Sequence, residues 1–173
     1  DGGLSIDWMK KTGAKVQNLL TKGSLNHLTH QLKKTPEQHF TEIAQAIALA
    51  QENNIETNVY LEDWSNGMRN SPEYVFQYLD FLTKQPIKRV LLPDTLGVLI
   101  PSETFKFISK IIARYPDTHF DFHAHNDYDL SIANVMEAVK AGIQGLHVTV
   151  NGMGERAGNA PLESTVAVIN DFF

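Results

Sequence analysis

The segment HFDFHAHNDYDL, residues 119–130, places an ionisable side chain at every second position. Asp121, His123 and His125 alternate with apolar residues. Successive side chains of a β-strand point to opposite faces, so the two imidazoles share one face. Their Cβ atoms then lie about 6 to 7 Å apart, from where two ring nitrogens can converge on one metal ion. The alternative is a half-buried strand whose histidines bond to neighbouring groups.

Polar residues recur where other expected strands end. Glu62 follows one apolar run, Thr95 follows the next, and a glycine-rich segment, NGMGERAGN, begins at Asn151. The carboxyl ends of parallel strands meet at one edge, where the loops converge into an active site. The sequence therefore predicts that these residues gather around the two histidines.

Composition limits the chemistry that this chain can perform. Its 173 residues are 42% hydrophobic and 20% charged, which is typical of a globular chain with a sizeable core. The formal net charge of -5, without a Lys/Arg block, argues against a nucleic-acid-binding surface. No apolar run is long enough for a membrane span. There are no cysteines, so any metal must use His, Asn or carboxylate ligands, and a reducing cytoplasm is compatible with the composition.

Five strand-like runs, each followed by a helix-like run, make up the chain. The runs expected as strands are 15–20, 55–63, 87–95, 119–127 and 145–152. The runs expected as helices are 35–54, 71–85, 104–115, 130–142 and 161–173, with an opening helix at 5–14. Strands that alternate with helices in this way predict a parallel sheet with right-handed crossovers, hence an α/β fold.

Two of the helices have readable starts and apolar faces. Thr35 and Gln38 form a capping box around Pro36, and Ser71 precedes Pro72 in the same manner. The expected buried residues are Phe40, Ile43, Ala44 and Ile47 in the first helix, and Val75, Tyr78, Leu79 and Leu82 in the second. We expect His39 to be a solvated helix position.

Between the two architectures that suit this pattern, we favour the (β/α)8 TIM barrel. A doubly wound sheet usually carries GxGxxG directly after a strand, and NGMGERAGN is only loosely similar to it. A full barrel needs about 250 residues. The sequence therefore predicts a partial barrel of about five βα units, in which residues 1–173 lack the N-terminal strands and the last one.

Four segments together resemble one enzyme family. HFDFHAHNDYDLSIAN, VNGMGERAGNAPLE, LPDTLGV and YLEDWSNGMRNSPEY are similar to the 2-isopropylmalate synthase, homocitrate synthase and citramalate synthase family. These enzymes have an HMG-CoA lyase-like (pyruvate carboxyltransferase-type) TIM-barrel domain that depends on a metal. The resemblance spans nearly the whole chain, and its most specific motifs are HxHND and NGxGERxGN in that order.

The resemblance implies a divalent metal site. Carried over residue by residue, its ligands are His123, His125 and Asn159. A further ligand, an Asp in a motif like RDGEQ, has no counterpart here, because DGG at the start lacks the flanking residues. The ion is magnesium, manganese or zinc, since imidazole and oxygen ligands suit all three. It would polarise the carbonyl of a 2-oxo acid for attack by acetyl-CoA.

The same resemblance implies further site residues. Glu62 and Thr95 would lie beside the 2-oxo acid, and Arg156 would pair with a carboxylate or thioester oxygen. The glycines of the last loop would let the backbone approach the acetyl-CoA cofactor, although turn geometry is a common alternative; they are Gly152, Gly154 and Gly158. Asp94 and Asp127 each have two possible roles, and the sequence does not decide between them. Each could orient neighbouring site residues, or could start a turn or cap a helix. His27 and His30 are candidate substrate contacts.

The expected function is a metal-dependent acyltransferase that condenses acetyl-CoA with a 2-oxo acid, of the 2-isopropylmalate synthase type. Relatives of this kind are cytoplasmic homodimers that act in branched-chain amino-acid biosynthesis. An HMG-CoA lyase-like activity is the alternative, but those enzymes usually carry a catalytic Cys in the glycine-rich loop. A biotin-dependent carboxyltransferase would need a metal-binding Lys at a strand end. A different class of alternative is a non-catalytic fragment, whose open sheet edges need a partner segment.

Overall fold

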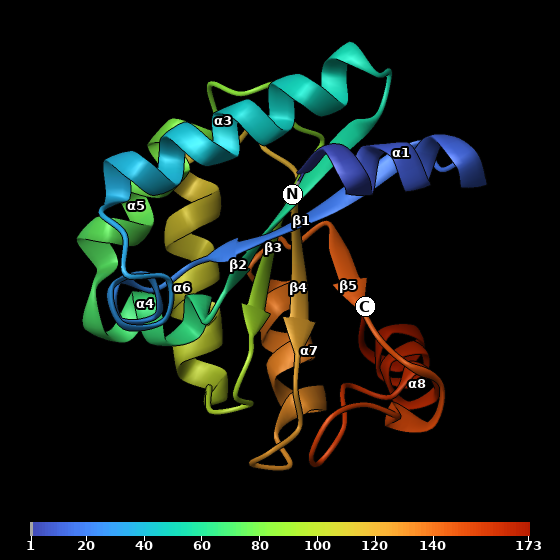
Figure 1. The fold of residues 1–173 in the computed structure, drawn as a ribbon. Helices are drawn as coiled ribbons and strands as arrows, with labels where there is room; N and C mark the ends of the chain where they lie inside the picture. Colours follow the sequence, from blue (N-terminus) through green and yellow to red (C-terminus); the bar gives the residue numbers. More distant parts are fainter. Residues whose placement is uncertain (1) are drawn as a thin grey trace.

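The computed structural model describes residues 2–173, and a five-stranded parallel sheet lies at its centre. Its strands are β1 (Val16–Lys22), β2 (Glu56–Glu62), β3 (Arg89–Asp94), β4 (Phe120–Ala124) and β5 (Gly145–His147). Its helices are α1 (Gly2–Thr12), α2 (Leu25–His27), α3 (Pro36–Glu52), α4 (Trp64–Asn70), α5 (Pro72–Leu82), α6 (Pro101–Arg114), α7 (Ser131–Lys140) and α8 (Leu162–Phe172), with a π-helical turn at Leu28–Leu32 and a 3₁₀ turn at Val150–Gly152. In Figure 1, β3 and β4 point downwards and their following loops gather at the lower end of the view.

The strands follow one another across the sheet in sequence order, β1-β2-β3-β4-β5, and every neighbouring pair is parallel. One or more helices cross over between each strand and the next. This repeat is that of a (β/α)8 barrel, whereas a doubly wound sheet reverses its strand order at a switch point. The fold is therefore α/β, a partial TIM barrel of five βα units, as the sequence predicts. No helix within residues 2–173 has both the length and the hydropathy that a membrane crossing requires.

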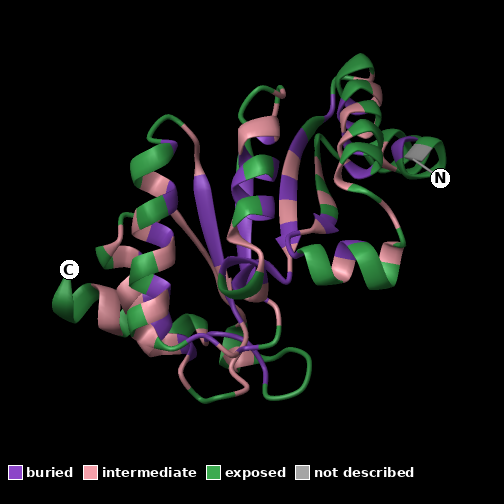
Figure 2. Cartoon of the chain, turned by 90° about the vertical axis from the view of Figure 1, so that its left-hand side faces the viewer, coloured by how far each residue is buried: buried purple, intermediate pink, exposed green. Residues whose placement is uncertain are grey.

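The hydrophobic core lies between the sheet and the helices that follow its strands. Figure 2 shows buried residues along the strands and on one side of the helices. Val59, Leu92 and Phe122 from the sheet are at most 1% exposed, as are Tyr78 and Leu79 from α5. Full burial of each such side chain stabilises the fold by about 1.5 to 3 kcal/mol. The expected apolar face of α5 is confirmed, and so is the capping box of Thr35 at the start of α3.

The opposite face of the sheet, here called the inner face, is polar. Along β2 every second residue is fully buried on the helix side, while the residues between remain partly accessible. The inner face carries Asn58, Tyr60, Glu62, Asp121, His123 and His147. All but His123 make hydrogen bonds or ion pairs across the strands, and the ring of His123 packs near that of His147. In a closed barrel this is the face that points toward the barrel axis.

Helix α4 was not anticipated from the sequence. The segment after β2 contains Gly67, which weakens a helix when exposed. Here a Cβ atom at Gly67 would lie 2.2 Å from the backbone oxygen of Gly23, so only glycine lets α4 pack against the loop that follows β1. Ser71 precedes α5 as expected, but its hydroxyl makes no capping bond and accepts the amide proton of Leu25 at 3.2 Å instead.

The prediction that His39 is solvated is wrong. His39 is only 4% exposed, because the buried stripe of α3 runs through His39, Ile43, Ile47 and Ala50. Its Nε2 accepts the backbone N–H of Lys22 at 3.2 Å, so the ring must be neutral at this atom. Burial lowers the pKa of His39 to about 4 from an ordinary 6.5.

This burial makes a stability prediction. In the unfolded chain His39 binds a proton below about pH 6.5, whereas in the folded chain it binds one only below about pH 4. The free energy of unfolding is therefore highest above about pH 6.5, and it falls as the pH drops from there to about pH 4. Between about pH 7.5 and about pH 5 the loss is about 1 to 2 kcal/mol. In His39→Gln, which keeps an acceptor for Lys22 without a titrating ring, urea midpoints should show a correspondingly shallower pH dependence. An unchanged slope would mean that His39 does not carry it.

Candidate metal centre

The two histidines of the HxH motif converge at the carboxyl end of β4. The Nε2 atom of His123 lies 3.3 Å from the Nε2 atom of His125, and the two ring planes are nearly perpendicular, at 87°. Two nitrogens that each bind one ion at about 2.1 Å, with an angle between about 90° and 110°, lie about 3.0 to 3.4 Å apart. The observed separation fits two ligands of one ion.

Both imidazoles are available as neutral ligands. Burial, together with the neighbouring His125 and His147, lowers the pKa of His123 to about 4. Burial also lowers the pKa of His125, with an additional contribution from the positive charge of Arg156. A neutral imidazole has a free lone pair, which is the form that binds a metal. The buried Nδ1 atoms of both rings have no hydrogen-bond partner among the described residues.

Asn159 lies beside this pair. His125 and Asn159 form an isolated antiparallel bridge, although they are far apart in the chain. Asn159 is 8% exposed, its Nδ2 donates to the backbone oxygen of Met153 at 3.2 Å, and its buried Oδ1 has no partner within residues 2–173. A buried oxygen without a partner, on a residue that is bridged to one of the two histidines, suits a third ligand. Within residues 2–173, no group of three His, Asp or Glu side chains is arranged so that it could hold an ion.

The glycines of the last loop pack around Asn159. A Cβ atom at Gly154 would lie 2.3 Å from the Nδ2 atom of Asn159. Gly158 has a φ of +92°, and a Cβ atom there would lie 2.2 Å from the backbone oxygen of Gly152. A side chain at Gly154 would therefore displace the amide of Asn159, and one at Gly158 would disturb the loop backbone that holds Asn159. The structure thus provides a packing reason for glycine at these positions. The expected approach of the backbone to acetyl-CoA is a separate reason.

Glu62 and Thr95 both stand at strand ends, as expected, and both already have partners. The carboxylate of Glu62 forms an ion pair with Lys22 on the neighbouring strand, in register with it. The hydroxyl oxygen of Thr95 accepts the backbone N–H of Asp63 at 2.8 Å. The hydroxyl proton of Thr95 is not used in that bond, so it can still be donated to a carboxylate.

The aspartates that were left open both organise loops. Asp94 is fully buried, and its Oδ2 accepts the backbone N–H of Leu99 at 2.9 Å, which closes the loop before α6. Burial raises the pKa of Asp94. Asp127 is not a cap, because α7 begins at Ser131 with Leu130 before it. Instead Asp127 forms an ion pair with Arg156, at 2.7 Å between Oδ1 and Nε.

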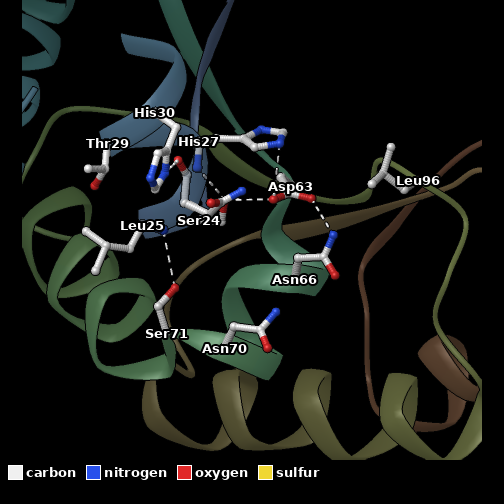
Figure 3. A pocket seen from close by; sticks show the side chains of 11 residues that line it. Ser24, Leu25, His27, Thr29, His30, Asp63, Asn66, Asn70, Ser71 and Leu96 are labelled. Atoms are coloured by element: carbon white, nitrogen blue, oxygen red, sulfur yellow. Dashed lines mark hydrogen bonds and ion pairs between the residues drawn. The ribbon is translucent and has the colours of Figure 1, made fainter. Parts of the chain in front are cut away.

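A pocket of about 580 Å³ lies between the loops that follow β1 and β2 (Figure 3). Asp63, 1% exposed, is at its base and accepts from Ser24 and from Asn66, each at 2.7 Å. Nε2 of His27 stands 3.4 Å from the same carboxylate, whereas exposed His30 bonds to the backbone oxygen of Asn26. The sequence suggested His27 and His30 as substrate contacts, but it gave no role to Asp63, whose carboxylate bonds to side chains from both loops.

His147 is another residue that sequence reasoning passed over, because it lacks the HxH spacing. Parallel pairing sets His147 opposite His123, and their ring centroids are 5.9 Å apart. Nδ1 of His147 meets the hydroxyl of Tyr60 at 2.8 Å, and Nε2 meets Asp121 at 3.2 Å. Asp121 also contacts His119 at 2.8 Å. Asp121 therefore belongs to a network beside His123 and is not one of the candidate metal ligands.

The chain is similar in sequence to two synthases of one archaeal species. It is 33% identical over 147 residues to homocitrate synthase of Sulfolobus acidocaldarius, which covers 85% of this chain and 31% of that enzyme. It is 34% identical over 161 residues to 2-isopropylmalate synthase of the same organism, covering 93% of this chain and 41% of the enzyme. The chain thus spans between about a third and two fifths of the length of these curated relatives.

Solved structures support the partial barrel. Hydroxymethylglutaryl-CoA lyase of Pseudomonas aeruginosa superimposes with a TM-score of 0.84 at 18% identity, over 95% of this chain and 58% of the lyase. HMG-CoA lyase of Bacillus subtilis gives a TM-score of 0.84 at 22% identity, over 96% of this chain and 59% of the lyase. At such identities the likeness shows the fold. A model of the HMGL-like family matches residues 5–171, nearly the whole chain. The chain therefore belongs to the HMGL-like family.

Proposed function

We propose that this chain supplies the histidine part of a divalent metal site in an acyltransferase that condenses acetyl-CoA with a 2-oxo acid. The observation that carries the proposal is the convergence of His123 and His125, with Nε2 atoms 3.3 Å apart. Asn159 is bridged to His125, and its buried Oδ1 has no partner within residues 2–173. The likeness to enzymes named homocitrate synthase and 2-isopropylmalate synthase supports this choice of reaction.

His123, His125 and Asn159 would hold the metal, which would be magnesium, manganese or zinc. When bound, the ion supplies a Lewis acid that polarises the keto group of the 2-oxo acid. Thr95 has a hydroxyl proton to donate to the substrate carboxylate, and Glu62 would lie beside the same substrate. Among 2-oxo acids, 2-oxoisovalerate is our first choice, followed by pyruvate and 2-oxoglutarate.

Several wider features belong to the same proposal. Residues 1–173 would be part of a catalytic barrel domain, whose remaining strands close the barrel and add the missing anionic ligand. The assembly would be a cytoplasmic homodimer that acts in leucine or related amino-acid biosynthesis. The alternative is an HMG-CoA lyase-like reaction, which the fold of the lyases favours, but the loop Gly152–Asn159 contains no cysteine.

Calorimetric titration of Mn²⁺ and Zn²⁺ into this chain tests the metal site. We expect one ion to bind per chain, and the His123→Ala, His125→Ala double variant to bind about 100-fold more weakly, since two of three ligands are gone. His30→Ala, at an exposed histidine, is the matched control and should bind as the parent does. Equal binding by the double variant and the parent would refute the site. Thiol release from acetyl-CoA with a panel of 2-oxo acids then tests the reaction.

A further inference from the structure

Arg156 is held by an unusually complete set of partners. Its Nε donates to Oδ1 of Asp127 at 2.7 Å, and its Nη2 donates to Oδ2 of the same carboxylate at 2.8 Å. Nη2 also donates to the backbone oxygen of Thr95 at 2.8 Å. Two parallel bonds between a guanidinium and a carboxylate fix distance and orientation together, which a lysine in this place would not do.

This arginine joins the loops that follow three successive strands. Thr95 follows β3, Asp127 lies after β4, and Arg156 belongs to the glycine-rich loop after β5. Asp127 also packs closely against the loop after β3. Its backbone nitrogen is so near to Gly97 that a Cβ atom there would lie only 2.6 Å from it. Gly97 has a φ of +61°, so glycine is the residue that permits this approach.

The backbone of the same loops is bonded around the candidate metal ligands. The N–H of Asn126 donates to the oxygen of Gly158 at 2.9 Å, and the N–H of Ala160 donates to the oxygen of Ala124 at 3.0 Å. These two bonds flank His125 in the segment after β4 and Asn159 in the glycine-rich loop. The position of Asn159 relative to His125 therefore depends on how firmly the glycine-rich loop is held against the β4 loop.

The charges around Arg156 do not favour a substrate anion. Besides Asp127, the carboxylate of Glu155 lies 3.5 Å from Nη1 of the guanidinium. One positive group thus faces two negative ones, and the cluster has no spare positive charge for a carboxylate of the substrate.

We propose that Arg156 is a positioning residue whose ion pair with Asp127 holds Asn159 beside His125, and that it does not bind the substrate. The proposal rests on the proposed metal site, which it deepens by naming what orients the amide ligand. It makes Asp127 and Arg156 one functional unit, so that loss of either member has the same consequence. It also assigns recognition of the 2-oxo acid carboxylate to other groups.

The first measurement is Mn²⁺ affinity by calorimetry for Asp127→Asn, Arg156→Gln and the double variant. We expect each single change to weaken Mn²⁺ binding about tenfold, and the double variant to bind no worse than either, because both changes break one pair. With Mn²⁺ saturating, the affinity for 2-oxoisovalerate should be unchanged. The proposal would be overturned if Arg156→Gln left Mn²⁺ binding intact and weakened 2-oxoisovalerate, with no parallel effect of Asp127→Asn.

Arg69 offers a matched control. Its guanidinium forms the same kind of arrangement, with the Glu103 carboxylate and with the backbone oxygen of Val98 at 2.7 Å, but it links α4, which contains Arg69, to α6 and to the segment before α6. Arg69→Gln should therefore leave Mn²⁺ affinity at the parent value. A loss equal to that of Arg156→Gln would show a general effect of removing an arginine.

Hydrogen exchange separates this proposal from the metal site. In the metal-free chain, Arg156→Gln should speed the exchange of the Asn126, Asn159 and Ala160 amides about tenfold, while Arg69→Gln should not. If the parent binds no Mn²⁺ but these amides respond as expected, the proposed metal site fails and the positioning role of Arg156 stands. If the amides exchange at the parent rate, the loops do not depend on Arg156 and the proposal is wrong.

Discussion

Replacing Trp64 by alanine should lower the free energy of unfolding by about 3 to 5 kcal/mol, one of the two largest effects that we expect. Trp64 is fully buried and meets Phe107 edge to face, with ring centroids 6.4 Å apart. It is the first residue of α4 and directly follows Asp63, whose backbone has a φ of +64°. Removing the indole would leave a cavity under the turn that presents Asp63 to the pocket, so the carboxylate should lose its fixed position as well.

The chain contains two tryptophans, and the other is a natural control. Trp8 is 65% exposed on α1, so Trp8→Ala should change stability by less than about 0.5 kcal/mol. Trp64→Phe should cost less than about 1.5 kcal/mol, because Nε1 of Trp64 has no partner in the described residues and no hydrogen bond is lost. Urea unfolding followed by circular dichroism measures all three variants. Equal losses for Trp8→Ala and Trp64→Ala would contradict the assigned core.

The turn around Trp64 also illustrates which part of the fold the sequence predicts. The alternation of strand-like and helix-like runs is enough to define five βα units and their parallel order, because both periodicities are local. Helix α4 was missed, since Gly67 signals a break unless its contact with Gly23 is known. That contact joins the loops after two different strands, and nothing in the local pattern reports it. Strand β5, expected over 145–152, pairs only over Gly145–His147.

The prediction that His39 is solvated was wrong for a different reason. The spacing of His39 with Ile43, Ile47 and Ala50 is that of a helix face, so the position was readable. The residue type misled, because histidine is buried less often than the aliphatic residues that share this helix face. Its hydrogen-bond partner is the backbone N–H of Lys22 on β1. Because Lys22 is far from His39 in the sequence, no local pattern predicts this bond.

For the candidate site, the sequence indicated side chains but not their partners. The alternation in β4 is sufficient to place His123 and His125 on one face, and their convergence follows from strand geometry. His147 could not be placed in the same way, since its position opposite His123 depends on the register between β4 and β5. The pairing of Arg156 with Asp127 depends likewise on how two loops pack. Register and loop packing are tertiary properties, whereas face and spacing are local ones.

The same register produces the second large effect, at Asp121. Its carboxylate, 2% exposed, accepts from His119 at 2.8 Å, from His147 at 3.2 Å and from Arg89 at 3.3 Å. Asp121→Ala leaves three partly exposed donors without their acceptor, and should destabilise the chain by about 2 to 3 kcal/mol. Asp117→Ala, at an exposed carboxylate of the loop before β4, should stay within about 0.5 kcal/mol. Urea unfolding followed by tryptophan fluorescence compares the two.

Gly145 makes this prediction sharper. Gly145 pairs with Asp121 across β4 and β5, and a Cβ atom there would lie 2.0 Å from Oδ1 of Asp121. Gly145→Ala should therefore be costly in the parent, because the carboxylate must leave its three donors to make room. In the Asp121→Ala background that space is already open, so the same methyl group should cost little. The double variant would then be far more stable than the sum of the single losses predicts. Additive losses would mean that Gly145 is not there to make room for Asp121, and that β5 requires glycine for another reason.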